Sequence, residues 1–166
     1  MPKDKKTQSK KSTIAKIVGS IVAIMIIAAS AFVVIKSNEE QVVTYEHEEN
    51  GTTTSMTYYA KGDTVYKQTT KSIIPYSSLG VETEAEARQA IDGMLSATQG
   101  INGYSDTVEY EEDHIIETVV VDYSVVNIDE IRDLPGNLFS EGSSNHVSLS
   151  KSLKMLEEAG FKKVDN

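Results

Sequence analysis

The sequence predicts an α+β protein, in which one transmembrane helix precedes a domain with an antiparallel sheet of about five strands and helices packed on one face. Three observations carry this prediction. Residues 17–35 form an uncharged run of 19 residues, short segments of alternating polarity are joined by turn signals, and later segments show the periodicity of amphipathic helices. The expected order is three strands, a helix, two strands and two helices.

The N-terminal part has the charge pattern of a membrane anchor. Residues 1–16 hold six lysines and one aspartate, whereas the whole chain has a net charge of −9. As a helix, residues 17–35 span about 28 Å, close to the hydrocarbon thickness of a bilayer. By the positive-inside rule we expect a basic cytoplasmic tail at 1–16 and a single-pass protein of the cell membrane whose C-terminal domain is extracellular.

Cleavage of this segment is the competing interpretation. Ala29-Ser30-Ala31 fits a signal-peptidase site, so the segment is either an uncleaved anchor or a signal peptide removed after Ala31. The apolar run continues through residues 32–35, which favours retention. The chain has no cysteine, which excludes a lipidated cysteine, disulfides, thiolate metal sites and a cysteine nucleophile.

A linker at 36–41 leads into the domain, which is expected to cover 42–166. Strands are predicted at 41–49, 52–60, 64–74, 104–112 and 115–126, and helices at 81–99, 127–134 and 148–160, with a loop at 138–145. Asn50-Gly51 is the strongest hairpin signal, Asp113-His114 is expected to join the second hairpin, and Pro75 should end the third strand. The Val- and Ile-rich segment 115–126 is the best candidate for a central strand.

Local signals define the two longer helices. Thr83 followed by Glu86 is a capping-box pattern, and Gly160 suits the left-handed position after the last helix, which lets Phe161 pack back on Leu156. The side chains expected to face inward are Ala87, Ile91, Met94, Leu95 and Thr98 in the first helix, and Leu149, Leu153 and Leu156 in the second.

Two acidic clusters beside predicted turns are candidate metal sites. If the turns converged, histidine and carboxylate groups could bind Zn²⁺, or carboxylate oxygens alone Ca²⁺. The candidate ligands are His47, Glu109, Glu111, Asp113 and His114. Their spacing matches no established metal loop, and a charged rim that keeps a sheet edge soluble is the favoured interpretation.

Ser148 to Lys151 match S-x-x-K, in which the lysine can act as base to a serine nucleophile. The companion motifs are missing, and Ser148 is better explained as a helix N-cap. Since no other catalytic or cofactor motif is present, the sequence predicts neither catalytic residues nor a cofactor.

Tyrosines are the remaining candidate binding groups. A sheet with alternating tyrosines can present a platform for sugar, peptide or another apolar surface, whereas core packing is the more ordinary role. The candidates are Tyr58, Tyr59, Tyr66 and Tyr76.

Four segments between about residues 42 and 163 have a recognisable order and spacing: "YYAKGDTVYKQTT", "YSSLGVETEAEA", "VEYEEDHIIETVVVDYSVVNIDEIRDLPG" and "LEEAGFKK". Together they resemble the YehR-like family of small bacterial surface lipoproteins. The resemblance implies a compact α+β domain at the outer face of a membrane, with no established activity and no catalytic residue to carry over. The chain departs from the family in lacking the lipidated cysteine, and we expect the protein helix to replace the lipid.

These observations lead to one functional expectation and one alternative. We expect a membrane-tethered cell-surface domain that is not an enzyme and serves as a binding or accessory module of the bacterial envelope. Its expected partners are the membrane, through residues 17–35, and an envelope protein or a cation. The acidic domain argues against nucleic-acid binding. The alternative is a metal-dependent envelope hydrolase or a cation-binding protein that uses the acidic and histidine cluster.

Overall fold

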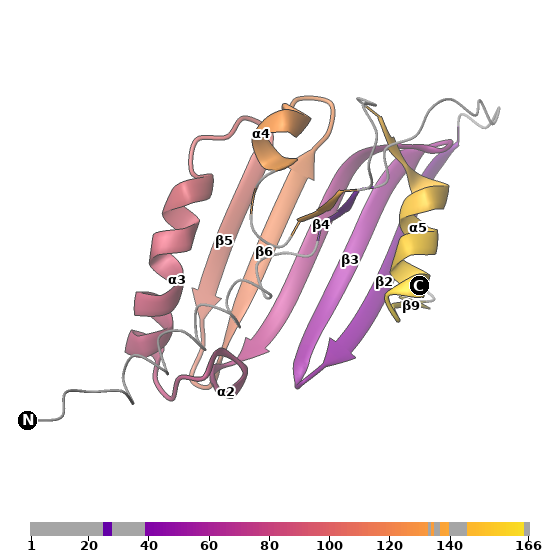
Figure 1. The fold of residues 1–166 in the computed structure, drawn as a ribbon. Helices are drawn as coiled ribbons and strands as arrows, with labels where there is room; N and C mark the ends of the chain where they lie inside the picture. Colours follow the sequence, from indigo (N-terminus) through magenta and orange to yellow (C-terminus); the bar gives the residue numbers. More distant parts are fainter. Residues whose placement is uncertain (1–24, 28–38, 133, 135–136, 140–145, 165–166) are drawn as a thin grey trace, which may run out of the picture.

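The structure is a computed structural model that describes residues 25–27, 39–132, 134, 137–139 and 146–164. Its main feature is a seven-stranded sheet with the order β5-β6-β4-β3-β2-β9, to which β8 adds by pairing with β4 (Figure 1). The strands are β2 (Glu40–Glu49), β3 (Thr52–Lys61), β4 (Thr64–Pro75), β5 (Tyr104–Tyr110), β6 (His114–Asp122), β8 (Val147–Ser148) and β9 (Lys162–Val164). All their pairings are antiparallel.

The first three long strands form where the sequence predicts them. Asn50 and Gly51, which join β2 to β3, have φ angles of 53° and 79°, the left-handed values that an Asn-Gly hairpin turn requires. Pro75 is the last residue of β4, as expected of a residue without a backbone donor. A register shift beside Tyr59 leaves Tyr66 as an extra residue in β4, so this hairpin contains a β-bulge.

The second hairpin is shifted from its predicted boundaries. β5 ends at Tyr110 and β6 begins at His114, and the Glu111 N–H donates to the His114 carbonyl at 2.9 Å. Residues 111–113 therefore make the turn, which corrects the predicted turn at Asp113-His114. β6 is internal, as predicted, but it ends at Asp122, because the Asp122 carbonyl accepts from the N–H groups of Val125 and Val126 and closes a turn.

The helices are α2 (Tyr76–Leu79), α3 (Glu84–Thr98), α4 (Ile128–Arg132) and α5 (Leu149–Glu158). The predicted N-cap of α3 is confirmed, since Thr83 accepts from the Glu86 N–H at 3.3 Å. The Glu86 carboxylate reaches back one residue further than in a standard capping box and accepts from the Glu82 N–H at 3.0 Å. After α5, Gly160 has a φ of 89°, and the Phe161 N–H donates to the Leu156 carbonyl at 2.9 Å. The predicted C-terminal cap is therefore present.

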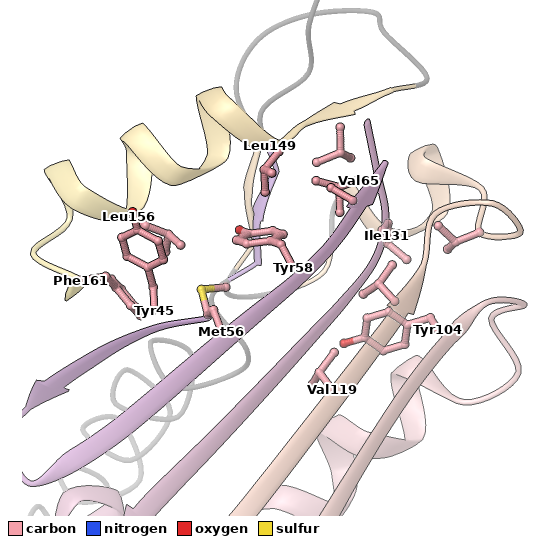
Figure 2. Packing of buried hydrophobic residues seen from close by; sticks show 14 residues of the cluster. Tyr45, Met56, Tyr58, Val65, Tyr104, Val119, Ile131, Leu149, Leu156 and Phe161 are labelled. Carbon is pink, nitrogen blue, oxygen red and sulfur yellow. The ribbon is translucent and has the colours of Figure 1, made fainter. Parts of the chain in front are cut away.

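Both long helices lie on the same face of the sheet, as predicted, with α3 beside β5 and α5 beside β2 (Figure 1). Beneath α5 a cluster of buried side chains includes Tyr45, Met56, Tyr58, Leu156 and Phe161, all of which are labelled in Figure 2. A second cluster beneath α3 contains Ile74, Leu79, Ala87, Ile91 and Ile115. The helix-covered face thus carries two separate apolar cores rather than one.

Four short elements were absent from the prediction. They are α2, β8, β9 and β7 (Asn137–Phe139), the last lying partly in the predicted loop at 138–145, whose residues 140–145 are outside the described part. Strands of two or three residues are too short to show alternation, and they form because a neighbouring strand offers unpaired backbone groups. The sheet therefore has seven strands rather than about five.

The predicted transmembrane helix falls mostly on residues that the structure does not describe. Its described part, Met25–Ile27, is a strand, β1, paired in parallel with β7. This corrects the helix prediction at these three residues, since Met and Ile can satisfy their backbone groups against a strand as well as within a helix. Among the described residues, no helix is long and apolar enough to cross a membrane. The cytoplasmic tail at 1–16 lies outside the described residues.

Candidate functional site

The centre of the helix-covered face is polar, between the two apolar clusters. Cross-strand pairing aligns Thr54 with Ser72 and Ser72 with Glu117, and the next rows hold Thr70 and Gln68. In β5, Asp106 is paired with Val119, so it shares this face. We name this set the polar stripe; it consists of Thr54, Gln68, Thr70, Ser72, Asp106 and Glu117.

The neutral members of the polar stripe satisfy one another. The Tyr123 hydroxyl donates to the Gln68 Oε1 at 2.8 Å, and the Gln68 Nε2 donates to the Thr70 hydroxyl at 3.1 Å. The hydroxyls of Thr54 and Ser72 are 3.4 Å apart. All four stripe residues are buried, so these contacts offset the desolvation that burial of polar groups would otherwise impose.

The burial of the two acidic members of the polar stripe, Asp106 and Glu117, is less well compensated. Glu117 is only 5% exposed, and the Oδ1 atom of Asp106 is buried with no hydrogen-bond partner in the described structure. Burial raises the pKa of Asp106 to about 6. The pKa of Tyr104 is also raised, first by burial and then by the charges of Asp106 and Glu117, so both carboxyl groups lie near this hydroxyl.

This arrangement predicts a pH-dependent effect of Asp106→Asn. Below about pH 4 Asp106 holds its proton in both states; between about pH 4 and 6 the folded state still holds a proton that the unfolded chain has lost. Folding free energy therefore becomes less favourable as pH rises through this window. After allowance for partial exposure, we expect Asp106→Asn to stabilise the chain by about 1–2 kcal/mol at pH 7.5 and by almost nothing at pH 4.

Urea unfolding followed by tyrosine fluorescence at the two pH values measures this difference. Glu109→Gln is the matched control, because Glu109 is an exposed acid on the same strand. A gain of stability in Asp106→Asn that is equal at pH 4 and pH 7.5 would show that Asp106 is not a strained carboxylate.

The polar stripe was not identified from the sequence. The signal that could have found it is the alternation in β6, which places Glu117 on the same face as Ile115, Val119 and Val121. A carboxylate at a position that the period-2 pattern assigns to the core is unusual, and it marks either a functional group or a structural cost. Chemically, such a carboxyl group can accept a hydrogen bond or pair with a cation in a water-poor setting.

The predicted metal ligands are distributed over separate places. His114 Nδ1 is 2.6 Å from an oxygen of Asp113, and the hydrogen bond from His114 lowers the pKa of that carboxyl. Glu109 is exposed, while the Glu111 carbonyl accepts from the Tyr76 hydroxyl at 2.5 Å. Within the part of the chain that the structure describes, no three His, Asp or Glu side chains converge in a way that could hold a metal ion.

His47 lies in β2, beside the C-terminal end of α5 and away from the β5–β6 turn that holds Asp113 and His114. Its Nδ1 is 3.2 Å from the Gly160 carbonyl, its ring is 5.0 Å from that of Phe161, and its Nε2 is 3.9 Å from Glu49. Next to it, a shallow hollow of about 570 Å³ is lined by glutamates of β2 and lysines of β9, so charges of both signs meet there. His47 therefore packs against the segment that follows the C-terminal end of α5.

The four candidate tyrosines do not form one platform. Tyr58 and Tyr76 are buried, one in each apolar cluster, and burial raises the pKa of Tyr58. Tyr59 and Tyr66 lie near one another, with ring centroids 6.5 Å apart, and the Lys67 ammonium is 5.1 Å from the Tyr59 ring. Tyr58 and Tyr76 are therefore core residues, whereas Tyr59 and Tyr66 lie on the opposite face of the sheet.

The serine of the S-x-x-K pattern is the N-cap of α5, which confirms the prediction. The Ser148 hydroxyl accepts from the Lys151 N–H at 3.4 Å and donates to an Asp63 oxygen at 2.7 Å. Burial would raise the pKa of Asp63, but the hydrogen bonds from Ser148 and Ser150 outweigh it and the pKa is lowered. Asp63 therefore fixes the start of α5 to the turn between β3 and β4.

The chain is thus a small single-sheet α+β domain with two long helices on one face of the sheet and the polar stripe between two apolar cores. The chain belongs to the DUF1307 family, described as a protein family of unknown function, whose profile matches residues 41–162. The predicted membership of a YehR-like family is thereby confirmed, since one relative and one solved structure bear that name.

Three similar proteins show how far this relationship extends. An uncharacterized lipoprotein of Listeria monocytogenes, Lmo0207, is 36% identical over 111 residues, which are 67% of this chain and 72% of the relative. The uncharacterized lipoprotein YehR of Escherichia coli K12 is 25% identical over 111 residues, 66% of this chain and 72% of YehR. An NMR structure of E. coli YehR superposes with a TM-score of 0.66 at 23% identity and covers 76% of this chain and 92% of YehR.

A more distant solved structure has the same fold. The NMR structure of a Streptococcus pneumoniae TIGR4 protein superposes with a TM-score of 0.53 at 16% identity, covering 81% of this chain and 93% of the other. At such identities the two solved structures support the antiparallel α+β architecture alone.

Proposed function

We propose that this chain is a membrane-tethered domain of the bacterial cell surface that binds a partner and catalyses no reaction. Its relatives are described as lipoproteins, which supports a position at a membrane surface. This chain contains no cysteine to carry a lipid, and the uncharged run at 17–35 has the length to replace it as a single-pass anchor. The anchor requires that Met25–Ile27, which pair with β7 in the structure, become part of a helix when the chain inserts into the membrane.

One observation supports the absence of catalysis: the candidate reactive side chains make contacts that hold the fold together. Ser148 caps α5 and binds Asp63, and His47 contacts the Gly160 carbonyl and Phe161. A nucleophile and its base must lie within hydrogen-bond reach of each other, and these two lie at opposite ends of α5. The metal-dependent alternative rests on the sequence alone, since the described residues bring no three ligands together.

Membrane fractionation tests the tether. In bacteria that express the chain, we expect it to stay in alkali-washed membranes with an intact N-terminus, and its domain to be open to protease added outside the cell. Ile26→Lys should reduce retention, because a charge at the centre of a spanning helix costs about 3 kcal/mol in insertion, whereas Ile26→Leu serves as the control. A soluble chain that begins at Phe32 would contradict the proposal.

A further inference from the structure

The sheet has a second face, on the side opposite α3 and α5, that no described helix covers (Figure 1). We name it the outer face. Its centre is a row of cross-strand neighbours in β9, β2, β3, β4, β6 and β5, namely Lys162, Glu46, Ser55, Lys71, Thr118 and Thr107. Adjacent rows add threonines and exposed apolar groups, among them Val42 (52% exposed) and Ile73 (39% exposed).

Charge on the outer face is arranged in columns along the strands. β4 contributes Lys67 and Lys71, and β2 contributes Glu46 and Glu48. Between them the side chains of β3 on this face are neutral from Thr53 to Tyr59, and the charge of Lys61 lies at the last residue of the strand. Among the described residues Lys71 has no ion pair, and Glu46 accepts a hydrogen bond from Ser55 at 2.7 Å. A positive column and a negative column therefore flank the neutral part of β3.

We propose that the outer face is a homodimer interface, in which two copies pack face to face around a two-fold axis that runs along β3. This rotation exchanges the flanks, so β2 of one copy lies over β4 of the other. Because Glu46, Ser55 and Lys71 share one row, Glu46 then lies opposite Lys71 of the second copy, twice by symmetry. β3 faces itself, and the isologous contact is closed.

The other two-fold orientation is unfavourable. An axis across the strands would place β2 over β2 and β4 over β4, which stacks glutamates on glutamates and lysines on lysines, and like charges that face each other destabilise an interface. The axis along β3 also keeps both copies of Glu40, the first residue of β2, at the same end of the dimer. Two chains anchored in one membrane require this, and to that extent the geometry rests on the proposed tether.

The area is sufficient for a specific contact. Strands about 4.8 Å apart with a rise of about 3.3 Å per residue give four ten-residue strands a face of roughly 600 Å², which approaches the accessible area of about 800 Å² per partner in standard interfaces. The short Thr and Ser side chains of β3 allow two sheets to approach closely, in the aligned manner of a β-sandwich.

A cysteine-free chain makes the test direct. Thr57→Cys places one thiol on β3 beside the axis, and a short bis-maleimide applied to membranes that hold the full chain should join two copies. Ser96→Cys, on the exposed side of α3, is the control and should join far fewer. Equal yields at both positions, or Thr57→Cys joined to a different protein, would overturn the proposal.

Charge reversal tests the orientation. Glu46→Lys and Lys71→Glu should each weaken dimerisation about tenfold or more, since both symmetry-related pairs become repulsive, and the double variant should restore it. The circular dichroism of each variant shows whether the fold is kept. Single reversals that fold and leave the yield unchanged, or a double variant that stays monomeric, would overturn the pairing. Failure of the tether would instead appear in the fractionation, as a soluble chain.

Discussion

Replacement of Gly103 by alanine is expected to destabilise the domain by about 3 kcal/mol. Gly103 has a φ of 79°, and an added Cβ would lie 2.7 Å from the Val126 backbone N and 3.0 Å from the Asp122 carbonyl O. Both the left-handed backbone and the contact with backbone atoms oppose a side chain. The site also ties β5 to β6, because the Gly103 carbonyl accepts from the Asp122 N–H at 2.8 Å.

Gly93→Ala is the matched control, with the opposite sign. Gly93 lies within α3, and a Cβ there would meet nothing within 4 Å. Alanine is favoured over glycine inside a helix by about 1 kcal/mol, so this variant should be more stable than the parent chain. Urea unfolding of the two variants measures both effects, and destabilisation by Gly93→Ala, or tolerance of Gly103→Ala, would contradict the geometry.

Leu156→Ala is the second change with a large expected effect, a loss of about 3 kcal/mol. Leu156 is fully buried between α5 and the sheet, close to Tyr45 and Phe161 (Figure 2). Truncation leaves a cavity in this cluster and weakens the hold of α5 on β2. Leu153 also packs on the cluster but is half-buried, so Leu153→Ala should cost only about 1 kcal/mol.

Thermal unfolding of the two leucine variants gives the comparison. The larger drop in Tm should belong to Leu156→Ala. Equal drops would indicate that α5 contacts the sheet through a wider surface than the structure shows.

Elements that depend on local interactions were predictable. The Asn50-Gly51 turn requires only its own two residues, and the N-cap of α3 requires residues three apart. The same holds for Gly160 after α5 and for the inward side chains of both helices, because helical periodicity and end signals are written within one turn of chain. The strand faces followed for a similar reason, since alternation assigns Thr54, Met56, Tyr58 and Ala60 to one side.

Features made by distant residues were not predictable. β8 and β9 exist because β4 and β2 offer them unpaired edges. The candidate metal site requires two predicted turns to converge, but His47 lies beside the C-terminal end of α5 and His114 at the turn of the β5–β6 hairpin.

By itself, the sequence determined the α+β class, the hairpins, the helix ends and the resemblance to surface lipoproteins, because these follow from neighbouring residues. Tertiary structure alone decided the order β5-β6-β4-β3-β2-β9. That order brings Asp106 and Glu117 together in the polar stripe and places β3, which is neutral on the outer face from Thr53 to Tyr59, between the lysines of β4 and the glutamates of β2. Both the polar stripe and the outer face depend on strand order, and strand order is set by packing between residues that are far apart along the chain.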